Sequence, residues 1–148
     1  MRNSLLYEQD FYAWANEQAA LLRSGRVSDA DLEHIAEEIE SMGRSEKREL
    51  ISRLKLLLAH LLKWQFQPTL RGNSWRLTIE EQRRDVAEHL ADNPSLKSKL
   101  PEAIVSAYGS AILVAARETG LGREVFPVEC PWPYDQAISD DFWPGDEG

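Results

Sequence analysis

Apolar residues recur at helical spacing along most of the chain and predict an all-α fold. No alternating run of apolar and polar residues is long enough to predict a strand. We therefore expect a single helical domain over residues 1–148, a bundle of about five helices whose antiparallel neighbours are joined by short loops. The predicted helices are residues 5–23, 29–42, 45–67, 75–92 and 95–119.

Capping and helix-breaking residues set the expected helix ends. Ser28 precedes Asp31 at the spacing of a capping box, and Gly120 follows the last predicted helix as its C-cap. Gly43 is either a cap or a tolerated kink, after which Ser45 restarts the helix. Pro68 ends that helix because the residue before proline is disfavoured in the α region.

Three apolar patterns indicate how these helices pack. Leu32, Ile35, Ala36, Ile39 and Met42 have the spacing of a coiled-coil seam. The leucine-rich stripe of residues 45–67 is wide enough for a central helix. Residues 102–116 are apolar nearly all round, which predicts a helix buried on every face, in the middle of the bundle or in a dimer interface.

Aromatic residues and prolines dominate the end of the chain. Residues 126–144 contain five aromatics and four prolines, and proline disfavours a long helix there. We therefore expect residues 125–148 to form an extended strap that lies over the bundle and covers one end of its core. A partner-binding tail is the alternative, because large exposed apolar patches mark interfaces.

Composition favours a soluble cytoplasmic protein. The chain has 148 residues, of which 43% are apolar, and one cysteine, which excludes an internal disulfide and fits a reducing compartment. It has no run of eighteen apolar residues and no apolar signal core at its start, so we expect no contact with a membrane.

Charge is distributed in three blocks along the chain. Residues 1–43 carry a net charge of −6, residues 44–84 of +6, and residues 85–148 of −8. The simpler interpretation is that the basic middle pairs with its acidic flanks across helix edges, where each exposed pair contributes roughly 0–1 kcal/mol. Alternatively, part of the basic surface stays unpaired and attracts an anion.

The basic middle contains the densest group of binding-type side chains. Between residues 63 and 76, three cations and two indoles lie near a predicted helix start, where backbone N–H groups bind anions and indole faces stack bases. This segment is therefore a candidate site for nucleic acid, which we do not favour, or for a phosphorylated ligand. Alternatively, the two indoles cover one end of the helical bundle, and Arg71 and Arg76 pair with acids such as Glu37 or Glu38. The candidate residues are Lys63, Trp64, Arg71, Ser74, Trp75 and Arg76.

Histidines at the edges of the apolar stripes suggest a metal-dependent enzyme as a second alternative. Imidazoles and carboxylates on facing helices build di-metal sites, but the usual Glu-x-x-His pairs are absent, and Asp31-x-x-His34 is the nearest approach. The candidate ligands are His34, Glu37, Glu38, His60 and His89.

Six segments, taken in order, resemble the bacterial domain of unknown function 29 family over nearly the whole chain. The resemblance implies a small all-helical bacterial protein and implies no activity or catalytic residue. The segments are Tyr7–Ala15, Glu33–Gly43, His60–Pro68, Ser74–Trp75, Thr78–Arg83 and Glu118–Leu121.

Recognisable catalytic motifs are missing from the sequence. It contains no nucleophile elbow, phosphate loop or dinucleotide fingerprint, and Cys130 follows an acid that does not stabilise a thiolate. We therefore expect no cofactor and predict a non-enzymatic interaction or regulatory module. We expect a protein partner or a homo-oligomer formed through the helix of residues 102–116 or an exposed aromatic face.

Overall fold

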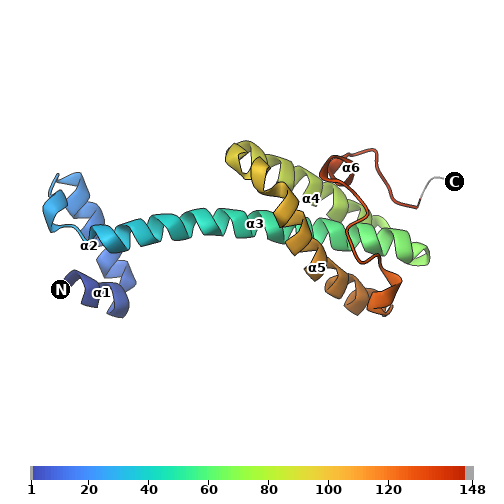
Figure 1. Ribbon diagram of the computed structural model, residues 1–148, viewed down its shortest axis with the longest axis horizontal. Helices are drawn as coiled ribbons and strands as arrows, with labels where there is room; N and C mark the ends of the chain where they lie inside the picture. The colour runs from blue at the N-terminus through green and yellow to red at the C-terminus, as the bar shows by residue number, and fades with distance from the viewer. Residues whose placement is uncertain (1, 146–148) are drawn as a thin grey trace. The chain divides into compact units, whose positions relative to one another are not determined.

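The chain is all-α, as the sequence predicts. The computed structural model describes residues 2–145, and the side chains of residues 5–145; this part of the chain contains no strand. Figure 1 shows its helices in chain order. The α-helices are α1 (Arg2–Gln9), α2 (Phe11–Arg23), α3 (Leu32–Phe66), α4 (Asn73–Asp92), α5 (Leu100–Thr119) and α6 (Tyr134–Ile138). The 3₁₀ turns are η1 (Val27–Asp29), η2 (Pro68–Leu70), η3 (Pro94–Lys99) and η4 (Arg123–Val125).

Contacts within the chain divide it into two compact units, where the sequence led us to expect one domain. Unit 1 comprises residues 1–45 and unit 2 comprises residues 46–148, so the boundary falls inside α3. Local apolar periodicity does not reveal such a division, because the pattern of α3 continues across the boundary.

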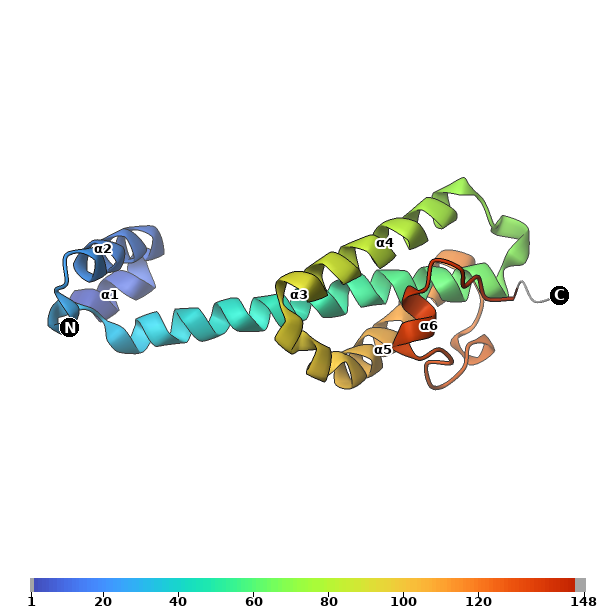
Figure 2. The same ribbon diagram turned by 90° about the horizontal axis from the view of Figure 1, so that it is seen from above.

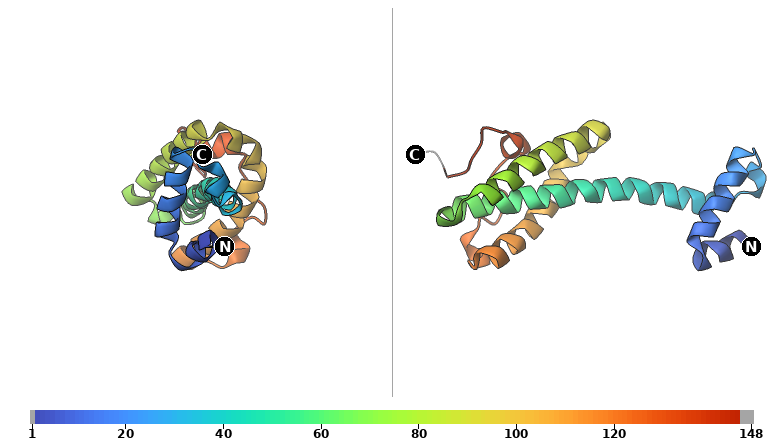
Figure 3. Two further views of the ribbon diagram at one scale, coloured as in Figure 1. Left: turned by 90° about the vertical axis from the view of Figure 1, so that its left-hand side faces the viewer. Right: turned by 180° about the vertical axis from the view of Figure 1, so that it is seen from behind.

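The second half of α3 is the central helix of unit 2, as its wide leucine stripe predicts. α4 and α5 pack along it from different sides (Figures 1 and 2), and Figure 3 shows the same arrangement from behind. Small residues on α5, among them Ala107 and Ala111, are fully buried and form part of this core. The α3 side chains buried in this core are Leu50, Leu54, Leu57, Leu58, Leu61 and Leu62.

Two predicted helix boundaries are wrong. Residues 5–23 form two helices because the Asp10 side chain accepts a hydrogen bond from Ala13 N at 3.1 Å and caps α2. Residues 29–42 and 45–67 belong to one helix, α3, which passes through Gly43 without a break. A glycine inside a helix costs about 1 kcal/mol relative to alanine, which the helical residues on either side offset.

Other helix ends differ from the prediction by a few residues. α3 begins at Leu32, and Asp31 rather than Ser28 accepts from the backbone, since Oδ1 of Asp31 lies 3.4 Å from His34 N. Residues 94–99 form a 3₁₀ turn before α5. Gly120 ends α5 with φ of 79°, as predicted for its C-cap.

α5 is not buried on every face, which corrects the prediction for residues 102–116. Val105 is 75% exposed and Leu113 is 48% exposed on the side away from the buried alanines. Residues Pro94–Thr119 are long and apolar enough to cross a membrane by length and composition, and 28% of their most apolar window is buried. Core helices of water-soluble proteins meet the same two criteria, so this observation alone places no membrane span.

The described part of the predicted strap packs on unit 2. Phe126 and Trp132 are buried there, Pro144 is fully buried, and α6 adds one short helix. The prediction for residues 146–148 lies outside the described residues. Aromatic and proline side chains therefore complete the core of unit 2 from the end of the chain.

Candidate functional site

The predicted ligand-binding residues lie together in unit 2, at the end of α3, directly after η2 and in the first turn of α4. Their arginines stack with indoles in an alternating order. The guanidinium carbons of Arg71 and Arg76 lie 5.1 and 5.4 Å from the Trp64 ring centroid. Arg76 also lies 5.1 Å from the ring of Trp143, and Arg83 lies 5.2 Å from it. We call this group the arginine–tryptophan stack.

Two of these arginines hold the strap through its main-chain carbonyls. Arg71 donates from Nε to Trp64 O at 2.6 Å and from Nη2 to Pro144 O at 3.2 Å. Arg83 is buried and donates to Ala137 O at 2.9 Å and to Phe142 O at 2.6 Å. Burial lowers the pKa of Arg83. The stack therefore fastens residues 137–144 to α4 and to the end of α3.

Lys63 is likewise used inside the fold. Its side chain is 5% exposed, donates to Glu118 Oε1 at 2.6 Å and lies 4.8 Å from the Trp75 ring centroid. The hydrogen bond from Lys63 lowers the pKa of Glu118. Ser74 is exposed in the first turn of α4.

These contacts leave Arg76 as the exposed cation of the stack. Among the described residues the Arg76 side chain has no hydrogen bond or ion pair, whereas the anticipated acidic partner Glu38 accepts from Tyr7 in unit 1. The Trp64 ring is buried and covered by guanidinium groups, so it offers no free face to a base. Binding of nucleic acid or a phosphorylated ligand through residues 63–76 stays a prediction.

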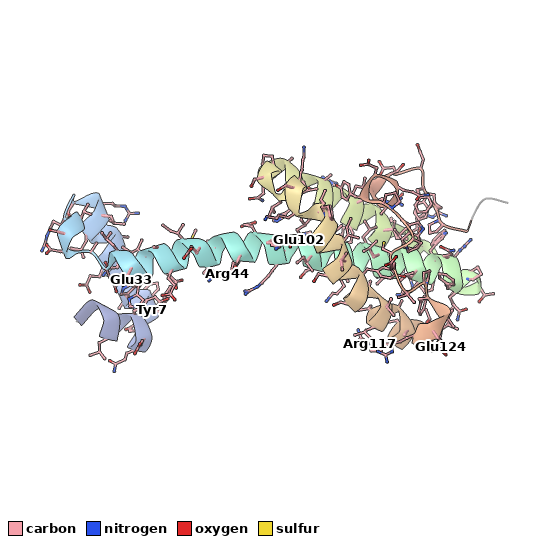
Figure 4. The ribbon with its side chains drawn as sticks, viewed as in Figure 1. Tyr7, Glu33, Arg44, Glu102, Arg117 and Glu124 are labelled. Carbon is pink, nitrogen blue, oxygen red and sulfur yellow. The ribbon has the colours of Figure 1, made fainter. Side chains whose placement is uncertain are left out.

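A polar and aromatic cluster in unit 1 joins α1 and α2 to the start of α3. Oδ2 of Asp31 accepts from His34 Nδ1 at 2.7 Å and from Trp14 Nε1 at 3.2 Å. Tyr7, labelled in Figure 4, donates from its hydroxyl to Glu38 and stacks on the His34 ring with centroids 4.1 Å apart. The sequence singled out His34 and Glu38, but nothing in it indicated their contacts with Tyr7 and Trp14.

Ionisation in this cluster follows from its hydrogen bonds. Burial would raise the pKa of Asp31, but bonds from His34 and Trp14 outweigh it and lower that pKa. The bond to Asp31 raises the pKa of His34 against the effect of burial. The bond to Glu38 raises the pKa of Tyr7 to about 12. Asp31 orients the His34 imidazole in the way that a carboxylate orients a general base in an enzyme. The same carboxylate also caps α3, so we assign the pair a structural role.

The remaining histidines occupy separate sites in unit 2. His60 donates from Nδ1 to Leu56 O at 2.9 Å, and burial lowers its pKa. His89 donates from Nε2 to Glu46 O at 2.8 Å. Over the described residues, no three His, Cys, Asp or Glu side chains are placed to hold a metal ion together. The predicted ligands His34, Glu37, Glu38, His60 and His89 therefore form no such group there.

Unit 1 exposes most of its large apolar side chains. Of its side chains that the structure describes, residues 5–45, Trp14 and Gln18 are the two that are buried. Unit 1 therefore has one buried apolar side chain and almost no core of its own. The exposed apolar residues are Leu5, Phe11, Tyr12, Leu22, Val27, Leu32, Ile39 and Met42.

A cavity of about 400 Å³ in unit 2 lies between α5 and residues 128–133. Val105 and Val128 line it and are both exposed. The Cys130 thiol also lines it, and burial raises the pKa of that thiol, so it stays protonated at neutral pH. The walls of this cavity are mostly apolar, and Glu129 also lines it.

Comparison with known proteins identifies a family and adds no activity. No curated protein and no solved structure matches the chain. A family model described as "Domain of unknown function DUF29" matches residues 6–143, which is nearly the whole sequence. The chain therefore belongs to the DUF29 family.

Proposed function

We propose that the protein is a non-enzymatic interaction module and that unit 1 carries its interaction surface. The observation that supports this is a contrast among the side chains of residues 5–45: one apolar side chain, Trp14, is buried, and eight large ones are exposed. Folded proteins seldom leave so much apolar surface uncovered unless it meets a partner.

The small size of unit 1 makes its lack of buried apolar side chains significant. A segment of 45 residues is near the limit below which a core alone rarely stabilises a fold, and small folds need staples such as disulfides, metals or association. The one cysteine of the chain lies in unit 2, and no metal-binding group occurs in the described residues. Association is the remaining means of stabilisation.

The packing of α3 within unit 1 points the same way. Its polar side, which carries His34 and Glu38, contacts Tyr7, and Asp31 directly before the helix accepts from Trp14. Leu32, Ile39 and Met42 lie on another side of the helix and are 53, 62 and 67% exposed. An amphipathic helix usually buries its apolar stripe. Here the polar side packs inward, so the apolar stripe is available to a partner.

Hydrogen exchange of the full chain at several concentrations tests this proposal. At high dilution, we expect amides of residues 11–42 to exchange far faster than those of residues 50–62, because only the latter belong to a packed core. Binding to the exposed apolar surface should slow exchange in residues 11–42 and leave residues 50–62 unchanged. Equally slow exchange in both segments at high dilution would show that unit 1 needs no partner and would overturn the proposal.

A paired substitution localises the effect. Ile39→Ser should abolish concentration-dependent protection of residues 11–42, because it removes an exposed apolar side chain of α3. Val105→Ser is the matched control, since Val105 is 75% exposed on α5 in unit 2. If Val105→Ser removes the protection and Ile39→Ser does not, the interaction surface lies on α5.

A further inference from the structure

The cavity in unit 2 combines mostly apolar walls with an acidic side chain. It lies between α5 and residues 128–133, and its volume of about 400 Å³ is within the range of about 300–1,000 Å³ that small-molecule sites occupy. We propose that this cavity binds a small primary amine, whose alkyl or aromatic group contacts the apolar walls and whose ammonium group pairs with Glu129. This inference goes beyond the interaction surface of unit 1 and does not depend on it.

Exposed apolar side chains border the cavity on two sides. Val105 on α5 is 75% exposed, and Val128 in the strap is 92% exposed. Both line the same cavity, together with Ile104 and Pro133. An apolar group bound there removes part of this surface from water, and that burial favours binding.

Gly109 keeps the α5 side of the cavity open. It lines the cavity, and a Cβ added at this position would have no atom within 4 Å. Glycine is among the least favourable residues inside a helix, so its presence in the middle of α5 does not serve the helix itself. A larger side chain has room there and would occupy space that a ligand needs.

Hydrogen bonds within the fold already use two of the polar groups in the wall. The Tyr108 hydroxyl donates to Pro127 O at 2.7 Å, and the Cys130 thiol donates to Trp132 O at 3.3 Å. Burial raises the pKa of Tyr108 to about 12 and also raises the pKa of Cys130, so both groups are uncharged at neutral pH. Neither group therefore supplies a charge or a free hydrogen to a ligand.

Glu129 determines which charge the ligand carries. Of the described residues that line the cavity, it is the one with an acidic or basic side chain, and it has no ion pair within the described part of the chain. An ammonium group gains an ion pair at this carboxylate, whereas an anion is repelled. The aromatic rings of Tyr108 and Trp132 in the wall also favour a cation.

Titration of the full chain with 2-phenylethylamine, followed by NMR, tests the site. For a ligand of nine non-hydrogen atoms we expect a Kd of about 1 mM. Amide signals of residues 104–109 and 128–133 should shift, and those of residues 11–42 should not. 2-Phenylethanol has the same carbon skeleton without the charge and should bind about fivefold more weakly, as for the loss of one exposed ion pair. Phenylacetate should not bind.

Two pairs of variants locate the ligand. Gly109→Leu should abolish binding, whereas Ser110→Leu adds the same side chain at an exposed position of α5 outside the cavity and should leave the Kd unchanged. Leucine favours a helix more than glycine or serine does, so both variants should fold. Glu129→Gln should reduce the affinity for the amine to that for the alcohol. Glu124→Gln is its control, because Glu124, labelled in Figure 4, is exposed and lies outside the cavity.

Three results would overturn the proposal. The first is an absence of shifts at about 10 mM 2-phenylethylamine, ten times the expected Kd. The second is an unchanged Kd in Gly109→Leu, which would place the amine elsewhere on the protein. The third is equal affinity of the wild type for the amine and the alcohol, which would show that the ammonium group is not recognised.

Discussion

Nδ1 of His34 lies 2.7 Å from Oδ2 of Asp31, and the other oxygen of that carboxylate lies 3.4 Å from the amide nitrogen of His34. One carboxylate therefore caps α3 and fixes the imidazole three residues later. The same carboxylate accepts from Trp14 on α2. Because this cluster joins α1 and α2 to the start of α3 through hydrogen bonds and ring contacts, its protonation affects the packing of α2 on the start of α3.

The stability of this cluster should depend on pH at both ends of a mildly acidic window. The pKa of His34 is raised in the folded chain, so its contribution is complete below about pH 6.5 and is lost as pH rises through the folded value. The pKa of Asp31 is lowered, so its contribution is present above about pH 4 and is lost as pH falls through the folded value. Unit 1 should be most stable between these limits.

NMR titration of the His34 ring checks this prediction. We expect a pKa above about 6.5 in the wild type and a return toward that value in Asp31→Asn, which keeps the shape and removes the charge. His60 serves as an internal control, because burial lowers its pKa and Asp31→Asn should not change it. An unchanged His34 titration in Asp31→Asn would contradict the assigned hydrogen bond.

Adjacent leucines on α3 should differ sharply in their contribution to stability. Leu57 is fully buried and Leu56 is 38% exposed. Leu57→Ala should lower the free energy of unfolding of unit 2 by about 2–5 kcal/mol, because it leaves a cavity in the core. Leu56→Ala should lower it by less than about 1 kcal/mol. Similar losses in the two variants, measured by urea unfolding, would contradict the placement of the leucine stripe.

The buried ammonium of Lys63 depends on Glu118. Glu118→Gln should lower the free energy of unfolding by about 2 kcal/mol, because it leaves a cation without its anion at a side chain that is 5% exposed. Lys63→Met retains the apolar stem and removes the charge, so it should cost less. Chemical unfolding of both variants measures which substitution lowers the free energy of unfolding more. A larger decrease in Lys63→Met than in Glu118→Gln would show that the charge itself stabilises the fold.

Two glycines should respond to alanine with opposite signs. Gly43 lies inside α3 with no atom within 4 Å of an added Cβ, so Gly43→Ala should stabilise the helix by about 0.5–1 kcal/mol. Gly120 has φ of 79°, so Gly120→Ala should destabilise the end of α5 by about 1 kcal/mol or more. Thermal unfolding of the two variants shows whether each substitution stabilises or destabilises the protein. A destabilising Gly43→Ala would indicate a break in α3.

Local pattern accounts for much of the helical fold. The stripe of residues 45–67 predicted the central helix of unit 2, and Gly120 predicted the end of α5, since spacing and capping act over a few residues. The continuity at Gly43 did not follow, because the cost of one glycine is small beside the helix around it. The exposed side of α5 was also missed, because its alanines fill the core and leave larger residues such as Val105 outside.

Contacts between distant segments could not be predicted from one sequence. The sequence suggested acids such as Glu37 or Glu38 as partners of Arg71 and gave no sign that Arg71 donates to the carbonyl of Pro144, 73 residues later. Tyr7 and Glu38 are 31 residues apart, and no local signal connects them. By contrast, the i, i+3 spacing of Asp31 and His34 was visible in the sequence, and their hydrogen bond depends on that spacing.

Hydrogen exchange of the full chain at high dilution tests most directly whether unit 1 depends on a partner. Trp14 is the buried apolar side chain among the described residues of unit 1, whereas Leu50 and Leu57 are fully buried in unit 2. We predict that the amides of residues 11–42 exchange far faster than those of residues 50–62. Equally slow exchange in the two segments would contradict this account.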